Sequence, residues 1–244
     1  MEELELKKNS HKLKMKKYGL HLHTKYSKCS NCDPKKILEI TKKQGFTGIA
    51  ITDHNTISGA LETKKLNKDK NFEVIIGEEV STDIGHVLIY YVKKEIMPGK
   101  VEDVIDEARE QKAICVLAHP YNLITSKIGE LLKIKNVRKT LSEDDVDKIK
   151  LFDAIEGFNA RCLFKKENIL SQKLAEIYKK PMIAGSDAHF PNEICNAWVE
   201  FDDEYTLRQA ILKGNIKLKG KRKHTLINKM HSTIRTLLPD FQTI

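Results

Sequence analysis

The sequence predicts one α/β domain in which strands and helices alternate along the chain. With 244 residues, 40% of them hydrophobic, the chain is long enough for one large core, and a single α/β barrel commonly has about 200–250 residues. Short apolar runs typical of strands alternate with amphipathic stretches long enough to be helices. This alternation implies parallel strands joined by right-handed crossovers. Both an open doubly wound sheet and a closed barrel have this pattern.

The first strand and helix show how each unit is recognised. Residues 18–23 alternate in polarity, so His21 and His23 lie on the same face of the predicted strand. Asp33 then supplies a helix N-cap, and Pro34 suits the first turn of the helix. A strand that presents two imidazoles is therefore followed directly by a helix.

The same pattern continues to residue 220. Further strands are expected at 48–52, 72–76, 86–92, 114–118, 152–156 and 181–184. Helices are expected at 58–66, 101–111 and 166–178, with a polar helical stretch before residue 150. Residues 199–220 predict a further strand, helix and strand.

The chain divides into a charged lead-in at 1–17, the main domain at 18–220 and a basic amphipathic helix at 221–244. Apolar residues recur with helical spacing in this last segment, at Ile227, Met230, Ile234, Leu237 and Leu238. Such spacing favours docking on the protein's own core over binding to a partner or a membrane surface.

The composition indicates a basic protein without a membrane anchor. The 43 Lys and Arg exceed the 34 Asp and Glu, giving a formal net charge of +9. This charge would attract phosphorylated metabolites or nucleic acid, although a merely basic surface explains it equally well. No apolar run reaches about 18 residues, and the N-terminus lacks the apolar core of a secretory signal. We therefore expect a cytoplasmic protein, and its five irregularly spaced cysteines predict reduced thiols.

The positions of the histidines carry most of the functional information. Six of the nine lie at or beside predicted strand ends, namely His21, His23, His54, His86, His119 and His189. In parallel α/β folds the ligand site forms at the carboxyl ends of the strands, so these imidazoles can converge. One histidine alone is more often a hydrogen-bonded structural residue than a metal ligand. The six together predict a shared site.

Acidic residues follow the same strand ends. Asp53, Glu78 or Glu79, and Asp187 would join the imidazoles in one cleft, where uncompensated buried charges cost several kcal/mol each. Divalent cations would remove that cost. Mixed carboxylate and imidazole ligands suit Zn²⁺, Mn²⁺ or Fe²⁺ better than Mg²⁺ or Ca²⁺. Each motif taken alone is also compatible with an ordinary turn or a solvated acidic loop.

In this order, the motifs HLH, TDH, GEE, a lone His, AHP and SDAH resemble the PHP family, the polymerase and histidinol phosphatase superfamily. The resemblance covers roughly residues 18–201, and its last part, from IEGFNAR through AWVEF, is similar to a PHP-associated C-terminal segment. It implies a distorted seven-stranded β/α barrel with a trinuclear metal site at the C-terminal ends of the strands. It also implies hydrolysis of phosphate esters.

The resemblance implies a specific set of ligands. His21, His23 and Asp187 would hold the first ion, and Glu79 would bridge to the second. The remaining ligands would be His86 and His119 for the second ion, and His54 and His189 for the third.

The third ion site departs from the family pattern. The family usually supplies an Asp or His just after the first motif, where this chain has Lys28 and Cys29. A Cys29 thiolate can bind Zn²⁺, and Asp33 is a possible substitute. A redox role for Cys29 and Cys32 as a C-x-x-C pair is the other interpretation of this segment. The resemblance therefore leaves two or three ions.

The expected reaction is hydrolysis of a small-molecule or nucleotide phosphomonoester or phosphodiester by a metal-activated water. Glu79 and Asp187 would act through the ions, and Arg161 is the best candidate for a bidentate phosphate clamp, with Lys25 second. The chain looks closest to stand-alone proteins near the nucleoside bisphosphate phosphatases, and histidinol phosphate is a weaker candidate substrate. The rival hypothesis is a nucleic-acid or partner-binding module that retains a structural metal site without turnover.

Overall fold

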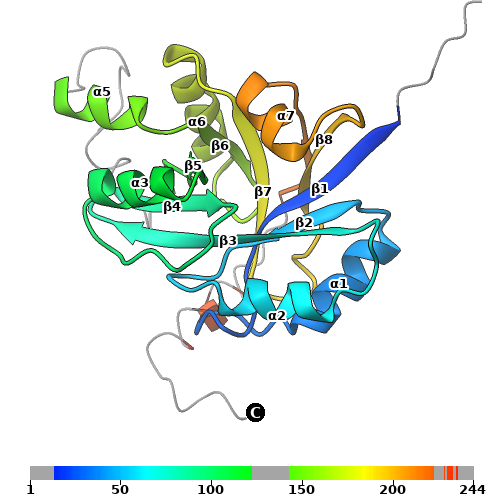
Figure 1. Cartoon of the computed structure of the whole chain (residues 1–244). Helices are drawn as coiled ribbons and strands as arrows, with labels where there is room; N and C mark the ends of the chain where they lie inside the picture. The colour runs from blue at the N-terminus through cyan, green and yellow to red at the C-terminus, as the bar shows by residue number, and fades with distance from the viewer. Residues whose placement is uncertain (1–13, 123–142, 223–227, 229, 233–234, 236–244) are drawn as a thin grey trace, which may run out of the picture.

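Seven strands close into a barrel in the computed structural model of the chain, which describes residues 14–122, 143–222, 228, 230–232 and 235. The strands pair in the ring order β1-β2-β3-β4-β5-β6-β7, and β1 pairs with both β2 and β7 to close the ring (Figure 1). The distorted seven-stranded barrel expected from the family resemblance is thus confirmed.

The strands of the ring are β1 (Met15–Leu22), β2 (Gly48–Ile51), β3 (Glu73–Thr82), β4 (Gly85–Tyr90), β5 (Ile114–Leu117), β6 (Ala154–Asn159) and β7 (Met182–Ala188). Two more strands, β8 (Ala197–Asp202) and β9 (Lys217–Gly220), extend the sheet antiparallel from the first half of β1. The helices are α1 (Pro34–Lys43), α2 (Ser58–Leu66), α3 (Val101–Glu110), α5 (Glu143–Lys150), α6 (Lys165–Ile177) and α7 (Leu207–Lys213).

One strand of the ring runs against the others, so the expectation of parallel pairing throughout was wrong there. β4 pairs antiparallel with both β3 and β5. The strand expected at 72–76 continues to Thr82, and only Asp83 and Ile84 separate it from Gly85. Two residues are too few for a crossover helix, but they suffice for a hairpin.

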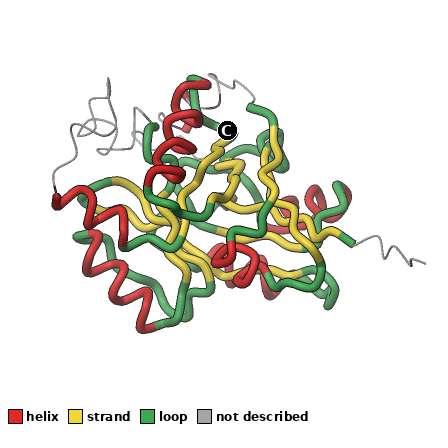
Figure 2. Tube along the Cα trace, turned by 90° about the horizontal axis from the view of Figure 1, so that it is seen from above, coloured by secondary structure: helices red, strands yellow, loops and turns green. Residues whose placement is uncertain are grey.

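Apolar side chains from every strand of the ring fill the barrel. Members of one buried cluster come from all seven strands: Leu20, Ala50, Ile75, Leu88, Val116, Ala154 and Ala184. Two further clusters pack the outside of the ring against its helices, one under α3 and α6 and one under α1 and α2. Figure 2 shows the strands at the centre with the helices around them. Polar groups therefore have room only at the ends of the barrel.

Local signals in the sequence set the element ends. Asp33 caps α1 by accepting a hydrogen bond from Lys35 N at 2.9 Å, and Gly45 follows the helix with φ of 72°. β1 begins at Met15, three residues before the expected start, because its first residues pair with β8.

The helix expected at 221–244 lies mostly outside the described residues. The described positions 228, 230–232 and 235 are helical, and Met230 is 57% exposed. Within the part of the chain that the structure describes, no helix is both long and apolar enough to cross a membrane.

Candidate metal centre

The predicted ligands come together at one end of the barrel. His21 and His23 lie at the end of β1, His54 follows β2, and Glu79 is in β3. His86 joins them because β4 is antiparallel, so its first residues lie at the same end of the barrel. The others are His119 after β5, Asp187 in β7 and His189 just beyond it.

Glu79 lies at the centre of this group. Its Oε2 is 3.3 Å from Nε2 of His21 and 3.2 Å from Nε2 of His23. Its Oε1 is 3.0 Å from both Nδ1 of His86 and Nε2 of His119. The two oxygens of one fully buried carboxylate thus face two different sets of imidazoles. This arrangement allows Glu79 to bridge two cations.

Asp187 forms the second acidic point of the centre. Its Oδ1 is 3.6 Å from Nε2 of His21, 3.4 Å from Nε2 of His23 and 3.4 Å from Nδ1 of His189. His21 and His23 therefore stand between two carboxylates, Glu79 and Asp187.

Several buried polar atoms of the centre have no hydrogen bond. They are Nε2 of His21, Nε2 of His23, Oε2 of Glu79 and Nδ1 of His86. Leaving such atoms unpaired costs about 1–3 kcal/mol each. The four atoms lie beside one another and are all good metal ligands, so divalent cations fit the residues present.

The charge states of the centre also suit cation binding. Burial by itself would raise the pKa of Glu79, but the surrounding imidazoles, His21 first, hold it well below its usual value. The same opposition keeps the pKa of Asp187 well below normal. Burial lowers the pKa of His54 to about 3 and that of His189 well below its usual value. Ionised carboxylates and neutral imidazoles are the forms that bind metals. Burial opposes a charge on His21, His23 and His119, but the neighbouring carboxylates raise their pKa values, so a bound cation would replace their protons.

Three residues of the centre, all at strand ends, have a strained backbone conformation that orients their side chains. His21, His119 and Asp187 have positive φ values of 65°, 25° and 51°. Residues other than glycine rarely adopt this region, and such strain is concentrated at functional sites. At His21 the strain coincides with a shift of register in the pairing of β1 with both β2 and β7. The bulge turns the His21 ring into the centre.

Sequence reasoning missed Glu156, which supports the centre from β6. Its Oε1 is 2.8 Å from Nδ1 of His21, and its Oε2 accepts hydrogen bonds from His119 N at 2.9 Å and Asn159 Nδ2 at 3.0 Å. Asn159 also donates to Oδ2 of Asp187 at 3.3 Å. The available signal was a carboxylate inside an otherwise apolar strand.

Gly185 leaves space for the contact between Glu156 and His21. A Cβ atom at Gly185 would lie 2.0 Å from Oε1 of Glu156 and 2.7 Å from Cβ of His21. Only glycine allows β7 to pass this close to the pair.

Asp53 orients neighbouring groups and belongs to none of the potential metal-binding groups found among the described residues. It accepts hydrogen bonds from Thr24 N at 2.7 Å and from Ser27 Oγ at 2.6 Å, and Ser27 Oγ is 3.2 Å from Nδ1 of His23. Of the two roles considered for Asp53, orientation is the one that these contacts support.

The potential third ion site contains three imidazoles. Ligand atoms of His23, His54 and His189 lie within 4.8 Å of one another. Cys29 belongs to none of the groups found among the described residues, and burial raises the pKa of its thiol to about 12. Asp33 is occupied as the cap of α1. The assignment of Cys29 as a ligand therefore stays a prediction.

The two candidate phosphate-binding cations lie in different surroundings. Lys25 is half exposed and pairs with Asp33 at 3.2 Å. Arg161 has only 10% of its side chain exposed, and its positive charge lowers the pKa of both Asp187 and His189. Its backbone N also donates to Asn159 Oδ1 at 2.8 Å, which links it to the residue that holds Asp187. These contacts favour Arg161 over Lys25 as the phosphate-binding residue.

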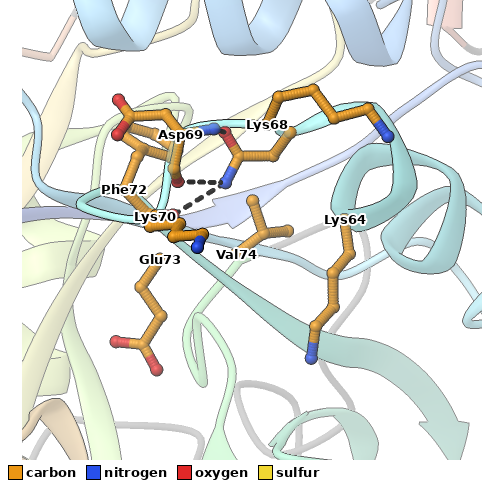
Figure 3. A pocket seen from close by; sticks show the side chains of 8 residues that line it. Lys64, Lys68, Asp69, Lys70, Phe72, Glu73 and Val74 are labelled. Atoms are coloured by element: carbon orange, nitrogen blue, oxygen red, sulfur yellow. Dashed lines mark hydrogen bonds between the residues drawn. The ribbon is translucent and has the colours of Figure 1, made fainter.

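A separate pocket lies beside the amino end of β3, lined in part by Lys64, Asp69 and Phe72 (Figure 3). Asn67 closes the loop there by donating to the carbonyls of Asp69 at 3.0 Å and Phe72 at 2.8 Å. The lysine side chains in Figure 3 point in different directions. This pocket contains none of the predicted ligands.

A closed barrel with imidazoles and carboxylates clustered at one end defines a barrel protein with a candidate metal centre. The model of the PHP domain matches residues 19–223, so the chain belongs to the PHP domain family. The chain is 34% identical over 149 residues to uncharacterized protein MJ1587 of Methanocaldococcus jannaschii, a match that covers 57% of this chain and 82% of that protein.

Two solved structures show the same fold. A putative metal-dependent phosphoesterase from Bifidobacterium adolescentis matches with a TM-score of 0.53 and 15% identity, over 70% of this chain and 87% of that one. A lesion-specific endonuclease from Pyrococcus furiosus matches with a TM-score of 0.58 and 17% identity, over 84% of this chain and 58% of that one. Family membership and the residues of the centre together support a metal-dependent hydrolase as the general class.

Proposed function

We propose that this protein is a phosphoesterase that hydrolyses small-molecule or nucleotide phosphate esters with two or three divalent ions, Zn²⁺, Mn²⁺ or Fe²⁺. The observation that carries the proposal is the position of Glu79. Its two oxygens face separate sets of imidazoles, and Oε2 is buried without a hydrogen bond. When bound, paired divalent ions supply a water of lowered pKa and neutralise charge on phosphoryl oxygens.

Different residues would bind the ions, orient the ligands and bind the phosphoryl group. Glu79 and Asp187 supply the negative charge that holds the ions, and Glu156 fixes the ring of His21 so that Nε2 points inward. Arg161, the buried cation beside Asp187, binds the non-bridging phosphoryl oxygens. His54 and His86 have the most exposed side chains among the ligands, 27% and 18%, so substrate enters on their side.

The substrate class rests on charge and on the known proteins with this fold. The net charge of +9 favours an anionic substrate. The neighbours described as a phosphoesterase and as a lesion-specific endonuclease support phosphate esters, with nucleic acid among them.

The rival function, a binding module with a structural metal site, is favoured by the basic C-terminal tail and by Cys29, which stands where the family usually has Asp or His. The eight candidate ligands, four of them with unpaired buried atoms, exceed the four ligands that a structural zinc ion requires, and the centre is open at His54.

The test is phosphate release together with metal content. The purified full-length protein, loaded with Mn²⁺ or Zn²⁺, is assayed on p-nitrophenyl phosphates and on a panel of nucleotides. We expect turnover that falls at least about 100-fold in Asp187→Asn and His119→Ala. Asp203→Asn, an exposed carboxylate in the loop before α7, is the matched control and keeps full activity. A metal-loaded protein that binds nucleic acid and hydrolyses no ester of the panel, releasing neither p-nitrophenol nor phosphate, would favour the rival.

A further inference from the structure

Described residues of the C-terminal segment, which lies beyond the end of the family match at residue 223, contact the loops beside the metal centre. Asn228 donates to Oε1 of Glu193 at 3.0 Å, and Ser232 donates to the carbonyl of Cys29 at 3.0 Å. Glu193 uses its other oxygen to accept a hydrogen bond from His189 N at 2.9 Å. The segment thus contacts both loops that carry ligands, the one after β1 and the one after β7.

Ser232 is the residue of this segment that contacts the candidate phosphate clamp. Arg161 Nη2 donates to Ser232 Oγ at 2.6 Å. The Ser232 hydroxyl donates its hydrogen to the carbonyl of Cys29, and its oxygen accepts the hydrogen bond from Arg161. Ser232 is only 7% exposed, so water does not readily replace it in this contact.

The Arg161 guanidinium, held by Ser232, still has one N–H donor without a hydrogen bond. Its Nε is buried and makes no hydrogen bond, and Oε1 of Glu193, at 3.6 Å, is too distant for one. A buried guanidinium with an unmet donor, beside a centre whose bound cations would attract anions, can donate hydrogen bonds to an oxyanion.

We propose that Ser232 is a positioning residue that holds Arg161 in place for the phosphoryl group of the substrate. The inference rests on the proposed function, since it takes the bound group to be a phosphate. It adds that residues outside the PHP match determine how tightly phosphate binds. Asn228 and Arg235 anchor the segment, Arg235 through a hydrogen bond from Nη2 to the carbonyl of Ser30 at 3.4 Å.

The test uses inorganic phosphate as the probe and calorimetry on the metal-loaded full-length protein. We expect Ser232→Ala to weaken phosphate binding about tenfold with unchanged metal content, and Ser232→Thr, which keeps the hydroxyl, to restore it. Met230→Ala, an exposed position in the same segment, is the control and leaves the affinity unchanged.

A double-mutant cycle separates positioning from general stability. If Ser232 acts through Arg161, Ser232→Ala has no further effect on phosphate affinity in the Arg161→Ala background. An equal further loss in that background, or unchanged or tighter phosphate binding in Ser232→Ala alone, overturns the inference. Should Ser232→Ala fold poorly, comparison of Ser232→Thr with the similarly shaped Ser232→Val gives the same answer.

Failure of the inference and failure of the proposed function are distinguishable. A protein that binds phosphate in a Ser232-dependent way but turns over no ester contradicts the proposed function alone. Normal turnover with phosphate affinity independent of Ser232 contradicts the inference alone. A metal-loaded protein that binds no inorganic phosphate contradicts the inference, and the turnover assay then decides the proposed function separately.

Discussion

Nδ1 of His21 lies 2.8 Å from Oε1 of Glu156, and both side chains are fully buried. The contact holds a hydrogen on Nδ1 and directs Nε2 at Glu79 and Asp187. Burial opposes a charge on His21, but Glu156, Glu79 and Asp187 raise its pKa well above normal. The site therefore stabilises positive charge at this point, which a divalent cation would supply.

Removing the charge of Glu156 should weaken metal binding, because Glu156 orients His21 and forms one of the potential metal-binding groups with His21 and His119. In Glu156→Gln the side chain keeps a similar shape but no longer fixes the ring of His21 with a carboxylate. We expect metal affinity to fall about 10–100-fold, measured by competition with a coloured chelator. Glu110→Gln, at an exposed position at the end of α3, should bind metal as the wild type does. Equal metal affinities of the two variants would contradict a role for Glu156 in metal binding.

Gly185→Ala should have a similar effect through geometry alone. The added methyl group would overlap Oε1 of Glu156, so that carboxylate must move away from His21. We expect reduced metal affinity together with a lower Tm. Gly99→Ala is the control, because a Cβ atom there meets nothing within 4 Å. A Gly185→Ala protein with normal metal affinity would show that the pair tolerates displacement.

Glu78, on the opposite face of β3 from Glu79, should make stability depend on pH. Burial raises its pKa to about 8; a hydrogen bond from Ile96 N opposes the shift, and Glu95 and Glu107 add to it. From pH 4.5 to about 8 the unfolded chain releases this proton while the folded chain keeps it, so folding loses roughly 1.4 kcal/mol per unit.

Glu78→Gln avoids that loss because an amide does not ionise. The free energies of unfolding of the variant and the wild type should be similar at pH 4.5. The variant should then become progressively the more stable of the two up to about pH 8, as measured by urea unfolding under identical metal conditions. If the free energies of unfolding of the variant and the wild type differ by the same amount at pH 4.5 and pH 8, the raised pKa of Glu78 is contradicted.

Cys29→Ser tests the third ion site. Because Cys29 is in none of the potential metal-binding groups among the described residues, the variant should keep the wild-type number of ions per chain, measured by mass spectrometry of the metals. His54→Ala, which removes a member of two groups, should lower that number. Loss of one ion in Cys29→Ser would instead establish the thiolate as a ligand.

The positions of the candidate ligands were predictable because each depends on local sequence. His21 and His23 follow from period-two alternation, and His119 and His189 follow apolar strands directly. The carboxyl ends of strands meet whatever the details of the barrel, so convergence could be inferred without its geometry.

The residues that support the candidate ligands were harder to predict from the sequence. Glu156 and Glu193 act through contacts with residues far away in sequence, and no short motif indicates such pairs. The reversal of β4 depends on a two-residue turn that the strand-by-strand pattern did not resolve. Ser232 reaches Arg161 over 71 positions, a contact that only the folded chain reveals.

The most direct test of the account is anomalous diffraction from crystals of the protein loaded with Mn²⁺ or Zn²⁺. The central claim is that Glu79 joins two cations. It predicts two anomalous peaks about 3.5–4 Å apart, one on the side of His21 and His23 and one on the side of His86 and His119. A single peak, or peaks that do not contact Glu79, would contradict it.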